Sequence, residues 1–217
     1  MQALFVHGMG RSSFSGCLML RHLRKAGIKT SSFGYFVSMQ SFEEIQTALA
    51  KRIAELARQG QYILIGHSLG GVLIRAALDS LPVGTPLPHH IFLLGSPVIP
   101  ARLAQLLSSN VIFRAVTRDC GHLLGSEERM QRIGIPQVPV IGIAGVKGFS
   151  KWLSPFGQEP NDGIVSLSEV TAEWLSGQVK LPIVHSLLPS SARVAHIILR
   201  QVGHAAPASV NFGVMQN

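Results

Sequence analysis

The sequence predicts an α/β fold in which about six mostly parallel strands form one sheet with helices on both of its faces. Two observations carry this prediction. Six short apolar segments, several of them rich in β-branched residues, are typical of buried strands, and segments with helical spacing lie between them. Strands that alternate with helices favour a parallel sheet covered on both sides. The expected strands are residues 3–7, 31–36, 62–65, 90–94, 138–144 and 179–184.

Three segments show the apolar periodicity of helices. Ser41 and Glu44 have the spacing of a capping box, in which the serine and the glutamate each bind the other's backbone. Apolar residues then recur at helical spacing through residues 45–56, and similar patterns fill residues 69–81 and 192–202. The first two of these helices connect successive strands, as a parallel sheet requires, and the third follows the last strand.

The chain of 217 residues is long enough for one domain with a sizeable core, and we expect residues 1–217 to form a single domain. Residues 97–136 are the least regular part, with weak helical signals and several polar breaks. This region forms either a small cap over a pocket or an ordinary connection with two surface helices, and the pattern favours the second slightly.

The composition is apolar, with 47% hydrophobic and only 14% charged residues. The charged share lies below the usual quarter, which indicates a compact globule with a rather apolar surface and argues against disorder. Polar residues, glycine or proline interrupt the longest apolar runs, so no transmembrane helix is expected. The first residues lack the features of a signal peptide, and Cys17 and Cys120 are too few for a disulfide framework. We therefore expect a cytoplasmic protein.

The formal net charge is +8, and part of it clusters at Arg21, Arg24 and Lys25. Basic residues favour the last turn of a helix, and Gly27 would end that helix. The alternative is an attraction to anionic lipid or nucleic acid. No aromatic residues or nucleic-acid motif accompany the charge, so we expect no nucleic-acid partner and at most a weak contact with a membrane surface.

The segment Gly66-His67-Ser68-Leu69-Gly70 carries the clearest chemical signal. It lies where a predicted strand ends and a predicted helix begins, which is the context of a nucleophile elbow. Such a turn holds the serine in a strained conformation, and side chains at the two glycine positions would crowd the backbone. Ser68 would then lie at a helix N-terminus, where the helix dipole favours developing negative charge. The pattern predicts that Ser68 is a nucleophile rather than part of an ordinary turn.

The first predicted strand ends in His7-Gly8-Met9-Gly10. Acyl transfer requires two backbone N–H groups directed at the oxyanion of the tetrahedral intermediate. We expect one of these groups from Leu69, which follows Ser68, and the other from Met9. The glycines on either side of Met9 would allow this loop to approach Ser68 closely.

With these motifs the chain resembles the α/β-hydrolase superfamily, and in particular its small esterases and lipases. The segments FVHGMG, IGHSLGG, NDGIVSL and VHSLLPSS occur in the order of that family and cover nearly the whole chain. The similarity extends to minimal bacterial lipases and to the hydrolase domain of GPI inositol-deacylase-like proteins. The resemblance implies an α/β-hydrolase fold and a triad of serine, acid and histidine in that chain order.

The acid of this triad is expected after the strand at residues 138–144, and Asp162 fits both that position and the family order. Gly163 would permit the turn that presents it, although Asn-Asp-Gly sequences also form ordinary turns. Glu159 is the nearest alternative, and Asp119 precedes the strand instead.

The base is expected between the last strand and the last helix, where His185 lies. His67 adjoins Ser68, but adjacent side chains at a strand-to-helix turn point apart. His196 falls inside the last helix, where a packed or surface role is more common. No HExxH motif or zinc-type spacing of Cys and His occurs, so we expect neither a metal nor another cofactor.

These residues together predict a serine hydrolase that cleaves carboxylic esters through an acyl-enzyme on Ser68, assisted by Asp162 and His185. The low charge content suggests an apolar acyl ester or a lipid-like small molecule as its substrate. A thioesterase or an acyltransferase would use the same triad. A non-catalytic binding protein of the same fold is the remaining alternative.

Overall fold

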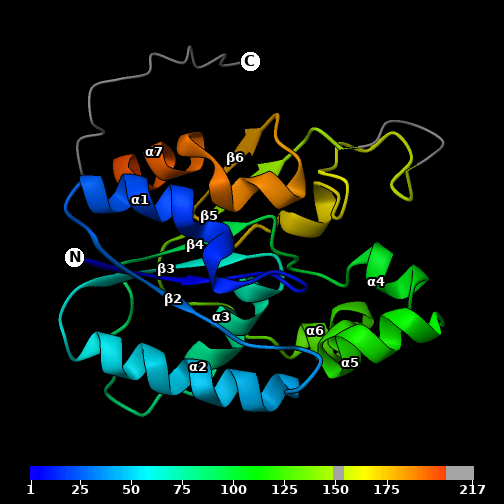
Figure 1. The fold of residues 1–217 in the computed structure, drawn as a ribbon, viewed down its shortest axis with the longest axis horizontal. Helices are drawn as coiled ribbons and strands as arrows, with labels where there is room; N and C mark the ends of the chain where they lie inside the picture. The colour runs from blue at the N-terminus through cyan, green and yellow to red at the C-terminus, as the bar shows by residue number, and fades with distance from the viewer. Residues whose placement is uncertain (149–153, 204–217) are drawn as a thin grey trace.

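The computed structural model describes residues 1–148 and 154–203 and forms one six-stranded sheet (Figure 1). Every neighbouring pair of strands in this sheet is parallel. The strand order is β2-β1-β3-β4-β5-β6. The predicted fold class is therefore confirmed, with a wholly parallel sheet. The strands are β1 (Gln2–Val6), β2 (Lys29–Phe33), β3 (Tyr62–His67), β4 (His90–Leu94), β5 (Val140–Gly145) and β6 (Gly177–Leu181).

The predicted strand boundaries are most accurate at the centre of the sheet. The segment 90–94 is reproduced as β4, and β3 begins at the predicted residue and continues to His67. At the two edges the predicted strands 31–36 and 179–184 lie two or more residues beyond β2 and β6. The edge strands are only partly buried, so their apolar pattern is weak and sets their limits poorly.

Helices cover both faces of the sheet (Figure 1). One face carries α1 (Cys17–Lys25) and α7 (Ala192–Gln201), and the other carries α2 (Phe42–Ala57) and α3 (Leu69–Asp79). The predicted capping box is present at the start of α2, where Ser41 Oγ accepts from the Glu44 amide and the Glu44 carboxylate accepts from the Ser41 amide. The basic residues Arg24 and Lys25 lie in the last turn of α1, as predicted for a helix end.

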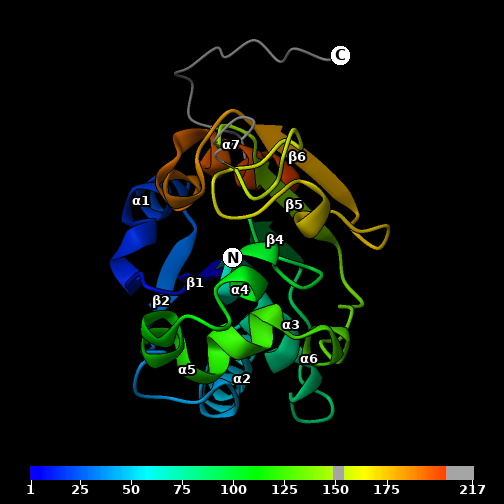
Figure 2. The ribbon, with the colours of Figure 1, turned by 90° about the vertical axis from the view of Figure 1, so that its right-hand side faces the viewer.

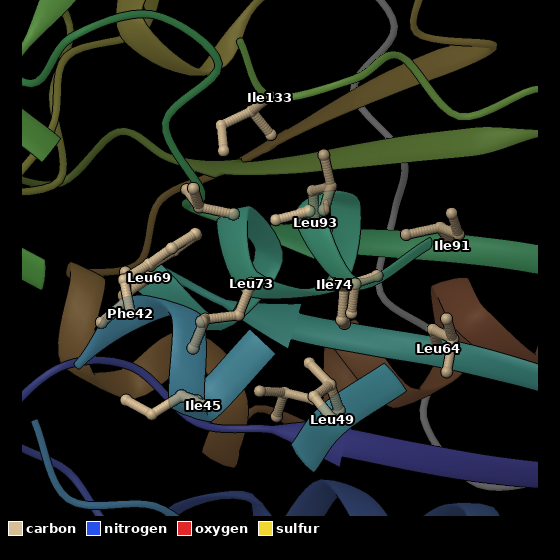
Figure 3. Close-up of a cluster of buried hydrophobic side chains, with 14 of the residues drawn as sticks. Phe42, Ile45, Leu49, Leu64, Leu69, Leu73, Ile74, Ile91, Leu93 and Ile133 are labelled. Atoms are coloured by element: carbon tan, nitrogen blue, oxygen red, sulfur yellow. The ribbon is translucent and has the colours of Figure 1, made fainter. Parts of the chain in front are cut away.

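Two apolar cores lie on the two faces of the sheet. The core under α2 and α3 is the larger one, and Figure 3 shows side chains of these helices meeting side chains of the central strands. Leu73 of α3 and Leu64 of β3 are fully buried there. Each such leucine contributes on the order of 2 kcal/mol by its removal from water. The packing fixes α3, and therefore the residue that precedes it, firmly against the sheet.

Residues 97–136 form three helices at the carboxyl edge of the sheet (Figure 2): α4 (Arg102–Leu106), α5 (Val111–Gly125) and α6 (Glu127–Gln131). Backbone dihedrals of φ 46° and ψ −130° at Arg118 interrupt α5. Val111 and Ile112, before this kink, are exposed, whereas Cys120 and Leu123, after it, are buried in the larger core. The second half of α5 is thus part of the domain, and a capping role for this region stays a prediction.

Three short 3₁₀ helices complete the described elements: η1 (Ser13–Gly16), η3 (Ser168–Val170) and η4 (His185–Ser190). All strands run in one direction, so the loops that follow them meet at one edge of the sheet, where ligands of such folds bind. Among the described residues, no helix combines the length and apolar character needed to cross a membrane.

Candidate active site

Ser68 occupies the turn between β3 and α3 in a strained backbone conformation. Its φ is 54° and its ψ is −125°, a region that residues with side chains rarely adopt. Its amide donates to the carbonyl of Leu94 over 2.9 Å, which ties the turn to the end of β4. A Cβ at Gly66 would collide with the backbone of Gly71, and a Cβ at Gly70 would collide with the carbonyl of Val6. The turn therefore requires glycine at both positions.

Asp162 and His185 form a buried hydrogen-bonded pair near this turn. His185 Nδ1 lies 2.6 Å from Asp162 Oδ2, and the two residues are 7% and 2% exposed. The other carboxylate oxygen, Oδ1, accepts from the amides of Ile164 and Val165. The His185 amide also donates to the Asp162 carbonyl over 2.9 Å. Because the ionised carboxylate only accepts, Nδ1 carries the proton and Nε2 is left to act as a base.

Gly95 connects this pair to the serine turn. It directly follows Leu94, whose carbonyl binds the Ser68 amide. A Cβ at Gly95 would lie 3.0 Å from both Asp162 Oδ2 and His185 Nδ1, and its φ is +54°. The structure thus brings Ser68, Asp162 and His185 together at the ends of β3 and β4. Among the described residues Ser68 Oγ has no hydrogen bond to His185 or to another side chain, and catalytic hydrogen bonds often tighten only when substrate is bound.

Two backbone amides lie beside Ser68. Leu69 is the first residue of α3, so its N–H has no acceptor within the helix. Met9 lies in a tight turn closed by a 3.2 Å bond from the Arg11 amide to the Gly8 carbonyl, with Gly10 at a φ of 68°. A Cβ at Gly8 would lie only 3.0 Å from Ser68 Cβ. The loop therefore lies close to the serine, and the oxyanion role of Met9 and Leu69 stays a prediction.

No family model and no curated protein matches the sequence. Solved structures do match it. A lipase of Bacillus licheniformis, BlEst2, in its mature form superposes with a TM-score of 0.75 at 17% identity, covering 94% of this chain and 92% of the lipase. The metagenomic carboxyl esterase MGS0156 gives a TM-score of 0.73 at 15% identity over 94% of this chain and 75% of the esterase. The chain has the α/β-hydrolase fold.

A thioesterase of the same fold is also similar. RedJ, from the prodiginine biosynthetic pathway of Streptomyces coelicolor, superposes with a TM-score of 0.63 at 16% identity over 93% of this chain and 84% of its own. Identities this low establish the arrangement of the chain only. The chemistry of this α/β-hydrolase domain must be argued from its own residues.

Glu159, the nearest alternative acid, is bound elsewhere in the domain. Its carboxylate forms a 2.7 Å ion pair with Arg102 and accepts from the Ser168 amide over 2.8 Å. Burial acts to raise the pKa of Glu159, but the hydrogen bonds from Ser168 and Arg102 outweigh it and lower the pKa to about 2. This carboxylate connects α4 to the loop that carries Asp162.

Asp119, the other alternative, also has partners away from His185. One oxygen accepts from the Phe42 amide over 2.9 Å, at the start of α2, and the other lies 2.5 Å from Arg129 Nη1. The hydrogen bond from Arg129 is the main cause that lowers the pKa of Asp119. Asp162 is thus the one of the three candidates that binds the histidine.

The other histidines considered as bases occupy different places. His196 lies on α7 with its ring 6.0 Å from that of His22 on α1, on the face covered by the smaller core. His67 is 1% exposed, and its Nε2 lies 3.0 Å from the carbonyl oxygen of His185. It therefore contacts the site through the backbone of the candidate base.

His7 shapes the loop that carries Met9. Its Nδ1 lies 2.8 Å from the Gly8 carbonyl, and the Tyr35 amide donates to its Nε2 over 3.3 Å. The two rings stack at 4.2 Å, and the Tyr35 hydroxyl donates to the His7 carbonyl over 2.7 Å. Because Nε2 accepts from the Tyr35 amide, the ring proton lies on Nδ1, and burial lowers the pKa of His7. No sequence pattern predicts the role of Tyr35, because its contact with His7 depends on the pairing of β1 with β2.

Glu169 is a second residue that sequence reasoning missed. Its side chain is fully buried, and it accepts from the amides of Arg102 and Ser166 over 2.5 and 2.6 Å. It fixes the start of α4 to the loop that follows Asp162. No local pattern marks such a residue, since its partners are set by the tertiary fold.

A pocket of about 960 Å³ lies at α5 rather than at Ser68. Its lining comes from residues 108–126, including Arg114, Arg118 and His122, and contains none of the three candidate catalytic residues. Among the described residues, no group of His, Cys, Asp or Glu side chains is arranged to hold a metal ion.

Proposed function

We propose that this protein is a serine hydrolase that cleaves carboxylic esters through an acyl-enzyme on Ser68. The observation that carries the proposal is the buried 2.6 Å contact between His185 Nδ1 and Asp162 Oδ2, beside a serine held in a strained turn. A buried carboxylate that fixes the tautomer of a histidine next to such a serine is the arrangement of a catalytic triad.

Each residue has one role in this mechanism. His185 Nε2 takes the proton of Ser68 Oγ, which attacks the ester carbonyl carbon. Asp162 orients the imidazole and stabilises its charged form. The amides of Met9 and Leu69 hold the negative charge on the carbonyl oxygen until the intermediate collapses. His185 then protonates the departing alcohol, and afterwards activates a water molecule that releases the acid.

The surroundings of the site support an apolar acyl group. Ile164, two residues after Asp162, is 43% exposed, and Leu187, two residues after His185, is 56% exposed. Met9 is partly buried against the larger core. Burying such side chains together with an acyl chain stabilises the complex by about 0.8 kcal/mol per methylene.

A thioesterase is the second candidate, supported by the similarity to RedJ. Its triad performs the same steps with a thiol as the leaving group. An acyltransferase would replace the water with an alcohol. A non-catalytic binding protein of this fold would have no need for the buried Asp162–His185 pair.

The test is a series of p-nitrophenyl esters with acyl chains of increasing length, compared with acyl thioesters of the same chains. We expect kcat/KM to rise from acetyl toward medium chains, and Ser68→Ala to abolish the activity. A flat profile or a sharp preference for acetyl would contradict the apolar acyl site. Faster cleavage of the thioesters than of matched esters would favour the second candidate. The absence of all turnover by folded protein would leave only a binding role.

We propose a cytoplasmic location, supported by the unpaired thiols of Cys17 and Cys120. The basic end of α1 suggests at most a weak contact with membranes. Co-sedimentation with vesicles should show no preference for anionic over neutral lipid at physiological salt. Strong, salt-sensitive binding to anionic vesicles that weakens when Arg21 and Lys25 are replaced would assign a docking role to that helix end.

A further inference from the structure

His67 is a polar side chain buried at the end of β3, directly before Ser68. It is 1% exposed, and its Nε2 lies 3.0 Å from the His185 carbonyl oxygen. A carbonyl oxygen only accepts hydrogen bonds, so Nε2 must carry the proton. The other ring nitrogen, Nδ1, is then a bare acceptor, and among the described residues it has no hydrogen-bond partner. These contacts therefore assign His67 the neutral tautomer with its proton on Nε2.

The unpartnered nitrogen lies against the loop that carries Met9. A Cβ at Gly8 would be 2.9 Å from His67 Nδ1 and 3.0 Å from Ser68 Cβ. The His67 and His185 rings lie 4.7 Å apart. One buried ring thus contacts the loop after β1 and the backbone of His185, while its own backbone continues into Ser68.

Several basic groups face this ring. The histidine ring of His185, the guanidinium of Arg11 and the ring of His7 all oppose a positive charge on His67. Burial is the larger cause, and together they hold the pKa of His67 well below its usual value. A neutral ring at this position adds no charge to the imidazolium that forms on His185 during catalysis.

We propose that His67 is a positioning residue that acts through His185 and the loop of Met9. Its Nε2–H fixes the backbone of His185, and its ring sets the spacing between that backbone and the Gly8–Met9 segment, so that His185 Nε2 and the two oxyanion amides converge on Ser68. The inference rests on the proposed function, because it assigns a role within the same site. Small displacements of catalytic groups are costly, and an error of about 1 Å can lower a rate by a factor of about 100.

Three substitutions separate the donor from the bulk of the ring. In His67→Gln the amide nitrogen reaches the position of Nε2 and can still donate to the His185 carbonyl. In His67→Asn the amide reaches only the position of Nδ1, and in His67→Leu no donor remains. We expect His67→Gln to keep kcat within about fivefold of wild type, and the other two to lower kcat by roughly 10- to 100-fold with KM changed less than about threefold.

The experiment measures kcat, KM and the pH dependence of kcat/KM for the wild type and the three variants, with thermal melts as the folding control. Rescue by His67→Gln alone supports the proposal. Equal kcat values in all three folded variants would overturn it, whether they match the wild type or fall together. The pH profile gives a second criterion if the Asn and Leu variants do not fold. If kcat/KM of His67→Gln still falls at acid pH as it does in the wild type, the base is another residue and the proposal is supported. If this acid limb of the pH profile is lost, His67 itself is the base. If the wild-type protein turns over no ester, the proposed function fails first.

Discussion

Ser68 and Arg118 have nearly the same unusual backbone conformation in very different surroundings. Their φ and ψ angles are 54° and −125° for Ser68, and 46° and −130° for Arg118. Among the described residues these are the two non-glycine positions with positive φ. Ser68 lies between a central strand and a buried helix, whereas Arg118 is exposed in the middle of α5.

The two conformations are held by different forces. At Ser68 close backbone packing holds the turn, because the glycines at 66 and 70 leave no room for a Cβ beside Gly71 and Val6. At Arg118 a few polar contacts hold the kink: its guanidinium donates to the Ser38 carbonyl over 3.0 Å, and the neighbouring Asp119 binds the Phe42 amide and Arg129.

Backbone strain alone therefore does not identify a nucleophile. The turn at Ser68 lies near a buried histidine–carboxylate pair, whereas the kink at Arg118 borders the pocket along α5 and makes contacts on the surface. Strain at Ser68 accompanies the proposed chemistry, and strain at Arg118 accompanies the change from an exposed to a buried half of α5.

The largest expected difference in kcat is between substitutions at two carboxylates, Asp162 near Ser68 and Asp119 next to Arg118. Asp162→Asn should lower kcat by about three to four powers of ten with folding nearly intact, because the amide can favour the wrong tautomer of His185. Asp119→Asn should leave kcat within a few-fold and act on stability instead, and Glu159→Gln should behave similarly. Kinetics at saturating substrate across pH, with thermal melts, compare the three. Near-native activity in Asp162→Asn together with a large loss in a folded variant of either rival would show that the acid is misassigned.

The next difference concerns how rigidly the serine turn is held. Gly70→Ala should destabilise the domain by about 3 kcal/mol or more, because its Cβ would meet the Val6 carbonyl inside a packed sheet. Gly34→Ala is the matched control, since a Cβ there would have its nearest neighbour at 3.8 Å. Urea unfolding of both variants measures the effect. A Gly70→Ala protein as stable as the control would mean that the turn is far more adaptable than its contacts indicate.

A smaller effect tests the strain itself. In an ordinary helix alanine is more stable than glycine by about 1 kcal/mol, but glycine tolerates positive φ without strain. The order should therefore reverse at both positions, with Ser68→Gly more stable than Ser68→Ala, and Arg118→Gly more stable than Arg118→Ala, by about 1 kcal/mol. Ala115→Gly, at an exposed position on α5, should show the normal order. Both Ser68 variants should be inactive and both Arg118 variants active. If alanine is the more stable residue at Arg118, the kink is not a stable feature of α5 in solution.

The smallest effect is a pH dependence of the α5 kink. The pKa of Asp119 is lowered in the folded protein, chiefly by its hydrogen bond with Arg129. Its contribution is therefore present above its ordinary pKa near 4 and is lost as the pH falls through the lower folded value. The side chain is 36% exposed, so screening limits the effect to about 1 kcal/mol or less. The melting temperature of the wild type should exceed that of Asp119→Asn at pH 7, and the gap should close at acid pH, once the pH lies below the lowered pKa of the folded protein. A gap that persists there would mean that the charge of Asp119 is not what stabilises the kink.

Local patterns were sufficient to predict the sheet and the position of Ser68. Alternating apolar strands and helices determine the fold class. The glycines around Ser68 predict a close approach of two backbone segments, which any residue with a Cβ would prevent. The capping box at Ser41 was recognisable for the same reason, because all its partners lie within three residues.

Features that depend on distant partners could not be read from the sequence. The kinked residue, Arg118, is neither a proline nor a glycine. The kink is held by hydrogen bonds to distant residues, from Arg118 to the Ser38 carbonyl and from the Phe42 amide to Asp119. His67 was expected to point away from Ser68, and no local pattern could show its bond to the His185 carbonyl, which spans 118 residues of chain. The contact of Asp162 with His185 likewise depends on the tertiary structure, because it joins the loops after β5 and β6.

The most direct test of the account is covalent labelling of the protein with a fluorophosphonate at neutral pH, followed by mass spectrometry of its peptides. The account predicts one adduct, on Ser68 Oγ, formed with loss of fluoride. Ser68→Ala should abolish the adduct, and His185→Ala should slow its formation by orders of magnitude, while Arg118→Ala should label at the wild-type rate. A folded protein that gives no adduct, or an adduct on another residue that persists in Ser68→Ala, would contradict the assignment of Ser68 as the nucleophile.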